Sequence, residues 1–158
     1  MFILALFCGH ALIKVRNGIV RGDLRRATRM IAGEVKRLRG KAACTHKRQV
    51  LGFDIDKNYL YTVKSLPKGK RPSELLLEER EAALDIMELP EDVYLEDVAL
   101  LSRGKNKWGE TVVGFFASGC VEPALIHLKN HKDEFYTLQI NPVTGHVKVY
   151  DRYVDQKK

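Results

Sequence analysis

Two stretches near the C-terminus decide the fold of this chain: Gly114-Phe-Phe-Ala-Ser-Gly119 and Asn141-Pro-Val-Thr-Gly-His-Val147. The second stretch separates two segments, 135–140 and 146–150, in which apolar and polar residues alternate. Proline fixes φ in the turn, and glycine can adopt the positive φ by which a chain reverses tightly. The sequence therefore predicts that the chain closes with a β-hairpin.

The N-terminal part of the chain has a different period. From residue 12 to about residue 45 there is no proline, and apolar residues recur at spacings of three and four. This spacing predicts one long helix with a single packing stripe. The predicted stripe consists of Val20, Leu24, Ala27, Ile31, Val35 and Leu38.

Composition separates this helix from the rest of the chain. With 158 residues there is room for one domain and an appendage. The net charge is +7, and residues 14–48 contain twelve Lys and Arg against two acids, whereas the remainder has fifteen bases and eighteen acids. Residues 1–13 carry no charged side chain, but about 20 Å of helix is shorter than the roughly 30 Å core of a bilayer. We therefore assign residues 1–46 to the N-terminal helix. Its first half, 1–13, is a partial membrane-spanning segment, and its second half, 14–46, is basic and amphipathic.

The sequence of residues 47–158 predicts a β-rich globular body. Alternation predicts a first hairpin from 50–55 and 59–64, followed by a basic loop at 65–73 and a short helix at 74–88 capped by Ser73. Further strands are expected at 93–101, 111–117, 123–129, 134–140 and 147–153, with a loop at 103–109. The predicted fold class is α+β, in which the long helix packs on an antiparallel sheet with a second sheet behind it.

Few residues have the type and spacing that would indicate catalysis, redox chemistry or metal binding. Cys8, Cys44 and Cys120 fit no metal or redox spacing; they are free thiols, or Cys44 and Cys120 form a disulfide. His127 and His131 would share a face on a helix, but here they flank the end of a predicted strand. No catalytic or phosphate-binding motif is present, so we expect no enzymatic activity, no cofactor and no metal site.

The basic helix allows two interpretations. Its arginines could contact DNA or anionic lipid, or they could form a solvated face or pack against acidic neighbours in a polymer. No aromatic residue lies between Phe7 and Phe53, so stacking on single-stranded bases is not supported. The candidate DNA or lipid contacts are Arg25, Arg26, Arg29, Arg37 and Arg39.

The order of these pieces resembles the GspH/FimT-type minor pseudopilins of type II secretion systems and type IV pili. The family motif positions that match are Phe115, Phe116, Gly119, Pro142, Thr144 and Gly145. The resemblance implies a pilin-like fold and a non-catalytic subunit that assembles with other pseudopilins through its N-terminal helix. It also implies a single-pass protein of the bacterial inner membrane with a periplasmic body. The secretin and the exported substrate are further candidate partners.

The resemblance fails at the N-terminus. Family members begin with a basic leader, a cleavage point and a glutamate before the apolar run, whereas residues 1–7 here resemble the middle of that helix. We expect a chain that lacks the leader and the start of the helix, so cleavage and N-methylation are assigned to no residue. Two alternatives stay open: a FimT-like minor pilin that binds DNA during uptake, and a basic nucleic-acid-binding protein. We expect DNA binding to be weak at most.

Overall fold

The computed structural model describes the backbone of residues 2–63 and 84–155, and the side chains of residues 22–63 and 84–155. Within these described residues, one helix precedes nine strands. The elements are α1 (Phe2–Thr45), β1 (Gln49–Asp54), β2 (Tyr59–Val63), β3 (Leu84–Glu88), β4 (Val93–Leu100), β5 (Gly104–Asn106), β6 (Glu110–Phe115), β7 (Ala124–Asn130), β8 (Phe135–Ile140) and β9 (Val147–Tyr150).

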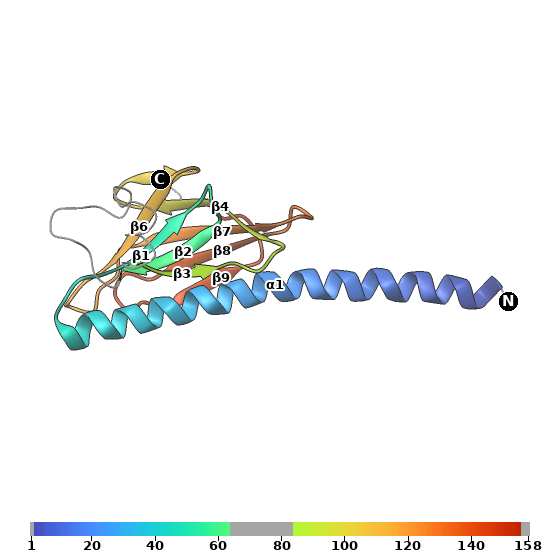
Figure 1. The fold of residues 1–158 in the computed structure, drawn as a ribbon, viewed down its shortest axis with the longest axis horizontal. Helices are drawn as coiled ribbons and strands as arrows, with labels where there is room; N and C mark the ends of the chain where they lie inside the picture. The colour runs from blue at the N-terminus through green and yellow to red at the C-terminus, as the bar shows by residue number, and fades with distance from the viewer. Residues whose placement is uncertain (1, 64–83, 156–158) are drawn as a thin grey trace.

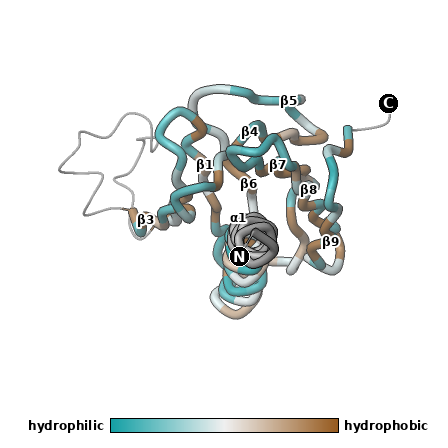
Figure 2. The backbone as a smooth tube through the Cα atoms, turned by 90° about the vertical axis from the view of Figure 1, so that its right-hand side faces the viewer, coloured by the Kyte–Doolittle hydropathy of each residue, from teal (hydrophilic) through white to brown (hydrophobic). Residues whose placement is uncertain are grey.

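The strands form two antiparallel sheets, and the C-terminal part of α1 packs against both of them. The four-stranded sheet has the order β3-β2-β1-β6, and the five-stranded sheet has the order β5-β4-β7-β8-β9. Viewed along the helix, β3 lies on one side of α1 and β9 on the other (Figure 2). The N-terminal part of α1 extends well beyond the body (Figure 1). The predicted α+β class with a second sheet is confirmed.

Both predicted hairpins are present. β1 pairs with β2 from Leu51↔Thr62 to Asp54↔Tyr59, and the Asp54 carboxylate accepts the Lys57 backbone N–H at 3.0 Å in the turn. β8 pairs with β9, and the amide N–H of Gly145 donates to the Asn141 carbonyl at 2.9 Å. Gly145 has φ of +66°, the conformation expected from the turn chemistry.

The structure corrects three local predictions. The helix predicted at 74–88 is wrong over its last five residues, which form β3; residues 64–83, including the predicted basic loop, lie outside the described residues. β3 pairs along the whole of β2 and buries Leu84, so tertiary pairing overrides helical spacing. The loop at 103–109 contains the short strand β5. The last strand ends at Tyr150 because residues 151–155 leave the sheet and cross its outer face.

One apolar core fills the space between α1 and the two sheets. The helix contributes Leu24, Ile31 and Leu38, and both sheets contribute large buried side chains. The fully buried members from the strands include Leu51, Phe53, Leu100, Phe115, Ile126 and Leu128. Burial of each such side chain is worth about 1.5–3 kcal/mol. The core, more than helix propensity, holds α1 on the body.

Candidate functional site: the helix and the two motif turns

The packing stripe of α1 faces both sheets. Leu24, Ala27, Ile31 and Val35 are fully buried, and Leu38 is 1% exposed. The helix contacts strands β1 and β6 of one sheet and β4, β7, β8 and β9 of the other. Val20 lies in the helix, but its side chain falls outside the described residues. The stripe therefore fixes the helix over the seam between the sheets.

The arginines of the helix fall into three groups. Arg25, Arg26 and Arg29 are exposed. Arg37 is also exposed, but its guanidinium pairs with the Glu34 carboxylate one turn earlier, and this hydrogen bond raises the pKa of Arg37. Arg39 alone among the five candidate contacts is half-buried, and it turns toward the body.

Arg39 connects the helix to both motif turns. Its Nε donates to the Gly119 carbonyl at 2.8 Å, and its Nη2 donates to the Val143 carbonyl at 3.4 Å. The backbone of Gly145 lies against the arginine stem, because a Cβ built on this glycine would be 2.4 Å from Arg39 Cδ. These bonds could not be predicted from the sequence. Through them the Arg39 guanidinium holds the helix against the body. Arg39 is thus placed differently from the other candidate contacts for DNA or lipid.

The two motif turns are bonded to each other. The Val121 N–H donates to the Pro142 carbonyl at 2.8 Å. In the first turn, Gly119 has φ of +81°, and its N–H donates to the Phe116 carbonyl at 2.9 Å. In the second turn, the Asn141 side chain accepts the N–H groups of Val143 and Thr144 at 3.0 Å each. The two turns, which are separated in sequence, therefore form one continuous surface that contacts the helix through Arg39.

The paired phenylalanines of the first turn point in different directions. Phe115 is fully buried in the core. Phe116 is 39% exposed, and the guanidinium carbon of Arg48 lies 5.4 Å from its ring centroid. This distance is that of a cation–π contact. Arg48 follows the helix, so the contact adds a second link between the helix end and this turn.

Glu122 anchors the strand that precedes the first turn. Its carboxylate accepts the Gly114 N–H at 3.1 Å and the Ser102 hydroxyl at 2.7 Å, and it pairs with Arg103 at 3.0 Å. Burial raises the pKa of Glu122, but the hydrogen bonds from Ser102, Arg103 and Gly114 outweigh it, so the pKa lies below its usual value.

A buried polar cluster lies on the opposite face of the five-stranded sheet. Asp97, His127 and Thr137 are neighbours on β4, β7 and β8. Their side chains point away from the face that carries Ile126 and Leu138 into the core. Residues 151–155, which we call the C-terminal strap, cover this cluster. His127 lies within β7 and His131 just after it, so the two histidines flank the end of a strand, as the sequence predicts.

The C-terminal strap is held by specific contacts. His127 Nδ1 lies 2.6 Å from Asp97 Oδ1, and Nε2 lies 2.9 Å from the Val154 carbonyl oxygen. The Tyr153 ring stacks on His127 with centroids 4.0 Å apart, and its hydroxyl donates to Asp97 at 2.8 Å. The Thr137 hydroxyl donates to the Arg152 carbonyl at 2.7 Å and accepts the Val154 N–H at 3.0 Å.

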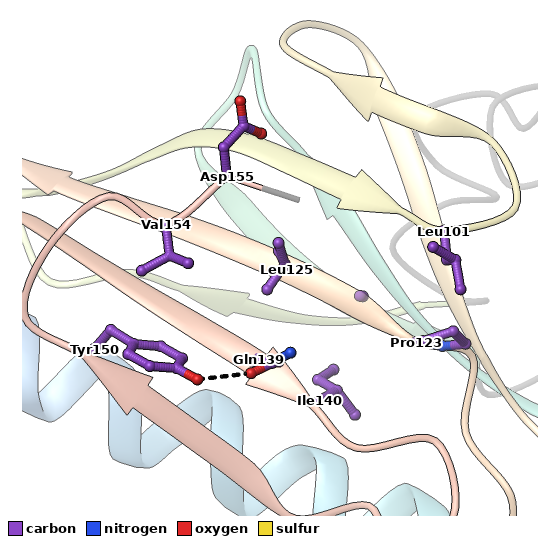
Figure 3. Close-up of a pocket in the computed structure, with 9 residues that line it drawn as sticks. Leu101, Pro123, Leu125, Gln139, Ile140, Tyr150, Val154 and Asp155 are labelled. Carbon is purple, nitrogen blue, oxygen red and sulfur yellow. Dashed lines mark hydrogen bonds between the residues drawn. The ribbon is translucent and has the colours of Figure 1, made fainter. Parts of the chain in front are cut away.

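A groove adjoins the strap on the same face (Figure 3). Leu125 and Gln139 lie between Val154 of the strap and Leu101 of the β4–β5 turn. The Tyr150 hydroxyl donates to the Gln139 side chain at 2.9 Å. The lining of the groove thus comes from three strands, a turn and the strap.

The remaining candidates for metal binding or redox chemistry are His131, Cys44 and Cys120. His131 lies after β7 and contacts Tyr94 and Asp92 at 2.8 and 3.2 Å. Cys44 and Cys120 are exposed free thiols. In the described part of the chain, no three His, Cys, Asp or Glu side chains are grouped to hold a metal ion. Within the residues described, no helix is both long and apolar enough to cross a membrane.

Comparison with known proteins identifies the fold. Neither a protein-family model nor a curated protein sequence matches this chain. The minor pseudopilin EpsH from the type 2 secretion system of Vibrio cholerae has a similar structure, with a TM-score of 0.60. The match covers 85% of this chain and 99% of EpsH at 13% sequence identity. The fold is that of a minor pseudopilin. In this pseudopilin fold, the Arg39 contacts join the long helix to the body.

Proposed function

We propose that this chain is a non-catalytic minor pseudopilin of a type II secretion pseudopilus. In this proposal, residues 1–46 are the assembly helix and residues 47–158 are the body. The body lies in the periplasm, and the helix places the subunit at the bacterial inner membrane. The partners are other pseudopilin subunits, with the secretin and the exported substrate as further candidates.

The shape of the helix carries this proposal. α1 is 44 residues long, and its N-terminal part extends beyond the body (Figure 1). The described contacts between α1 and the core begin at Leu24. A helix held at one end and projecting at the other can pack its projecting part with equivalent helices of neighbouring subunits. The likeness to EpsH, which is itself a minor pseudopilin, supports the same assignment.

Site-specific cross-linking in cells tests the assembly. Gly22 is exposed on α1 just before the first core contact at Leu24, and a side chain built there has open space around it, so a photo-reactive residue fits without disturbing the fold. We expect cross-links from position 22 to sister pseudopilins of the same secretion system. The matched control is Lys107, which is exposed and follows β5 on the far side of the body from α1 (Figure 2). Equal cross-linking from both positions would contradict assembly through the helix.

A FimT-like minor pilin that binds DNA is the second candidate. The observation that favours it is the exposed group Arg25, Arg26 and Arg29, which lie within about one turn of α1. Arginines on one helix can neutralise phosphates of a duplex. The two candidates differ in measurable consequence: deletion of the protein lowers secretion in the first case and DNA uptake in the second.

A further inference from the structure

The hydrogen bonds of His127 define its protonation. Nδ1 faces Asp97 Oδ1 at 2.6 Å, and Nε2 faces the Val154 carbonyl oxygen at 2.9 Å. A carbonyl and an ionised carboxylate accept hydrogen bonds but do not donate them, and a neutral imidazole has only one N–H. Both bonds can therefore exist together only if the pair of Asp97 and His127 holds one proton more than a carboxylate beside a neutral ring.

The geometry assigns the extra proton to the ring. Two acceptor oxygens, Asp97 Oδ1 and the Val154 carbonyl, face the two ring nitrogens, so a proton on each nitrogen satisfies both bonds when Asp97 is a carboxylate. Burial raises the pKa of Asp97, but hydrogen bonds from His127 and from the Tyr153 hydroxyl outweigh it, and the pKa of Asp97 is lowered, which agrees with the carboxylate form. The side chains of the two residues are 1% and 0% exposed, so the ion pair is shielded from water.

We propose that the C-terminal strap is a proton-dependent latch, closed while both ring nitrogens of His127 carry a proton and released when rising pH removes one. The neutral ring keeps its N–H toward Asp97 and turns a bare nitrogen lone pair toward the Val154 carbonyl. Two acceptors then face each other at the point where the strap crosses β7. The remaining backbone bonds of the strap, through Thr137, join neutral groups and are weaker than charge-assisted bonds. The Tyr153 bond to Asp97 and the exposed pair of Lys105 with Asp155 do not depend on the His127 proton, so release begins at Val154.

The groups that face the His127 ring come from three strands and the strap. Asp97 faces it from β4, Tyr153 stacks on it from the strap, and β8 supplies Thr137, which does not titrate. From β5, Lys105 bonds Tyr153 and pairs with Asp155 of the strap at 3.0 Å. The pKa of Asp97 is lowered and those of Tyr153 and Lys105 are raised, which moves all three away from neutrality.

Release of the strap changes the outer face of the sheet. Val154 and Leu125 both line the groove (Figure 3). When the strap lifts, the groove loses the Val154 part of its lining and the buried pair Asp97 and His127 meets water. The latch thus controls how much of the outer face of β7 is accessible.

Hydrogen exchange measured by NMR on the full-length chain tests the latch. The reporter is the Val154 amide, which donates to Thr137 at 3.0 Å, and the reference is the Leu138 amide in β8. Between about pH 5.5 and pH 8.5 we expect the protection factor of Val154, corrected for intrinsic exchange, to fall by about tenfold or more. The Leu138 protection factor stays constant over that range.

Two variants separate the latch from general pH effects. In His127→Gln the side chain cannot gain a proton, so the protection of Val154 should no longer depend on pH. In the matched control His131→Gln, which alters an exposed histidine, the pH dependence should be that of the parent. Val154 protection that is independent of pH in the parent, or equally pH-dependent in His127→Gln, would overturn the proposal.

Nitrogen shifts of the His127 ring give a test that requires no variant. We expect two protonated ring nitrogens at acid pH and one at alkaline pH. The midpoint of this change and the midpoint of Val154 release should agree within about one pH unit. A ring that is neutral throughout, or midpoints further apart than this, would contradict the latch.

Discussion

The guanidinium of Arg39 bonds the carbonyl of Gly119, a residue 80 positions away, at an Nε to oxygen distance of 2.8 Å. The same side chain bonds Val143 in the other motif turn. One arginine of the helix therefore contacts both of these turns, which lie in different parts of the sequence.

Removal of the Arg39 side chain should destabilise the body. Arg39→Ala leaves two carbonyls without their charged donor, and we expect the free energy of unfolding to fall by about 1–3 kcal/mol. The matched control is Arg37→Ala, which removes an exposed ion pair with Glu34 and should cost no more than about 0.5 kcal/mol. Urea denaturation measures both. Equal effects of the two substitutions would show that the Arg39 bonds contribute nothing measurable.

Gly145→Ala should couple to Arg39. The φ of +66° at this position disfavours any Cβ by about 1–2 kcal/mol, and the added Cβ would also meet the arginine stem. In the Arg39→Ala background the steric part disappears, so Gly145→Ala should cost less there than in the parent. A double-mutant cycle on unfolding free energies measures the difference. Strict additivity would mean that backbone conformation alone accounts for the cost.

Leu38→Ala should lower the unfolding free energy by about 2–5 kcal/mol, because the side chain is 1% exposed in the core. Lys36→Ala, at an exposed position in the same stretch of α1, should change it by less than about 0.5 kcal/mol. Thermal or urea unfolding of both variants checks the prediction. A loss at Leu38 as small as that at Lys36 would place the stripe outside the core.

Glu122 should make stability depend on acid pH. Its pKa in the folded state is lower than in the unfolded chain, where glutamate titrates near 4.3. The unfolded state therefore binds the proton more readily, so the stabilisation is complete above the unfolded pKa and is lost as pH falls through the folded pKa. Melting temperatures measured from neutral to acid pH should fall less steeply in Glu122→Gln than in the parent. Parallel curves for the two proteins would exclude this role.

Binding of duplex DNA should be weak. Arg37 is exposed but pairs with Glu34, and Arg39 donates to backbone carbonyls, so the main exposed group among the five candidates is Arg25, Arg26 and Arg29. Near physiological salt we expect a Kd in the non-specific range of about 10⁻⁴ to 10⁻⁶ M. Fluorescence titration of a labelled duplex measures it. A submicromolar Kd that is lost in the charge-reversed triple variant R25E/R26E/R29E would favour the DNA-uptake candidate.

Local patterns predicted the helix and both hairpins because each depends on neighbours in the sequence. The spacing of Leu24, Ile31 and Leu38 and the turn residues Pro142 and Gly145 are signals of this kind. β3 was missed since a five-residue strand at a sheet edge is defined by its pairing with β2, and its own sequence also suits a helix.

The functional contacts were harder to predict. Nothing in the sequence separates Arg39 from Arg37, because the difference is set by carbonyls at Gly119 and Val143 that only folding brings near. The partnership of His127 with Asp97 and Val154 likewise joins three segments, and the position of His127 on the polar face of an alternating strand was the one available signal.

The seam between α1 and the two sheets leads us to expect a particular response to mechanical force. The helix projects beyond the body (Figure 1), so a pull on its free end would act along its axis and load the buried side chains of Leu24, Ile31 and Leu38. Because these side chains are buried at successive levels along the axis, the force loads them together in shear instead of peeling them apart one at a time. The Arg39 bonds to Gly119 and Val143 lie toward the far end of the same seam, where they resist sliding of the helix.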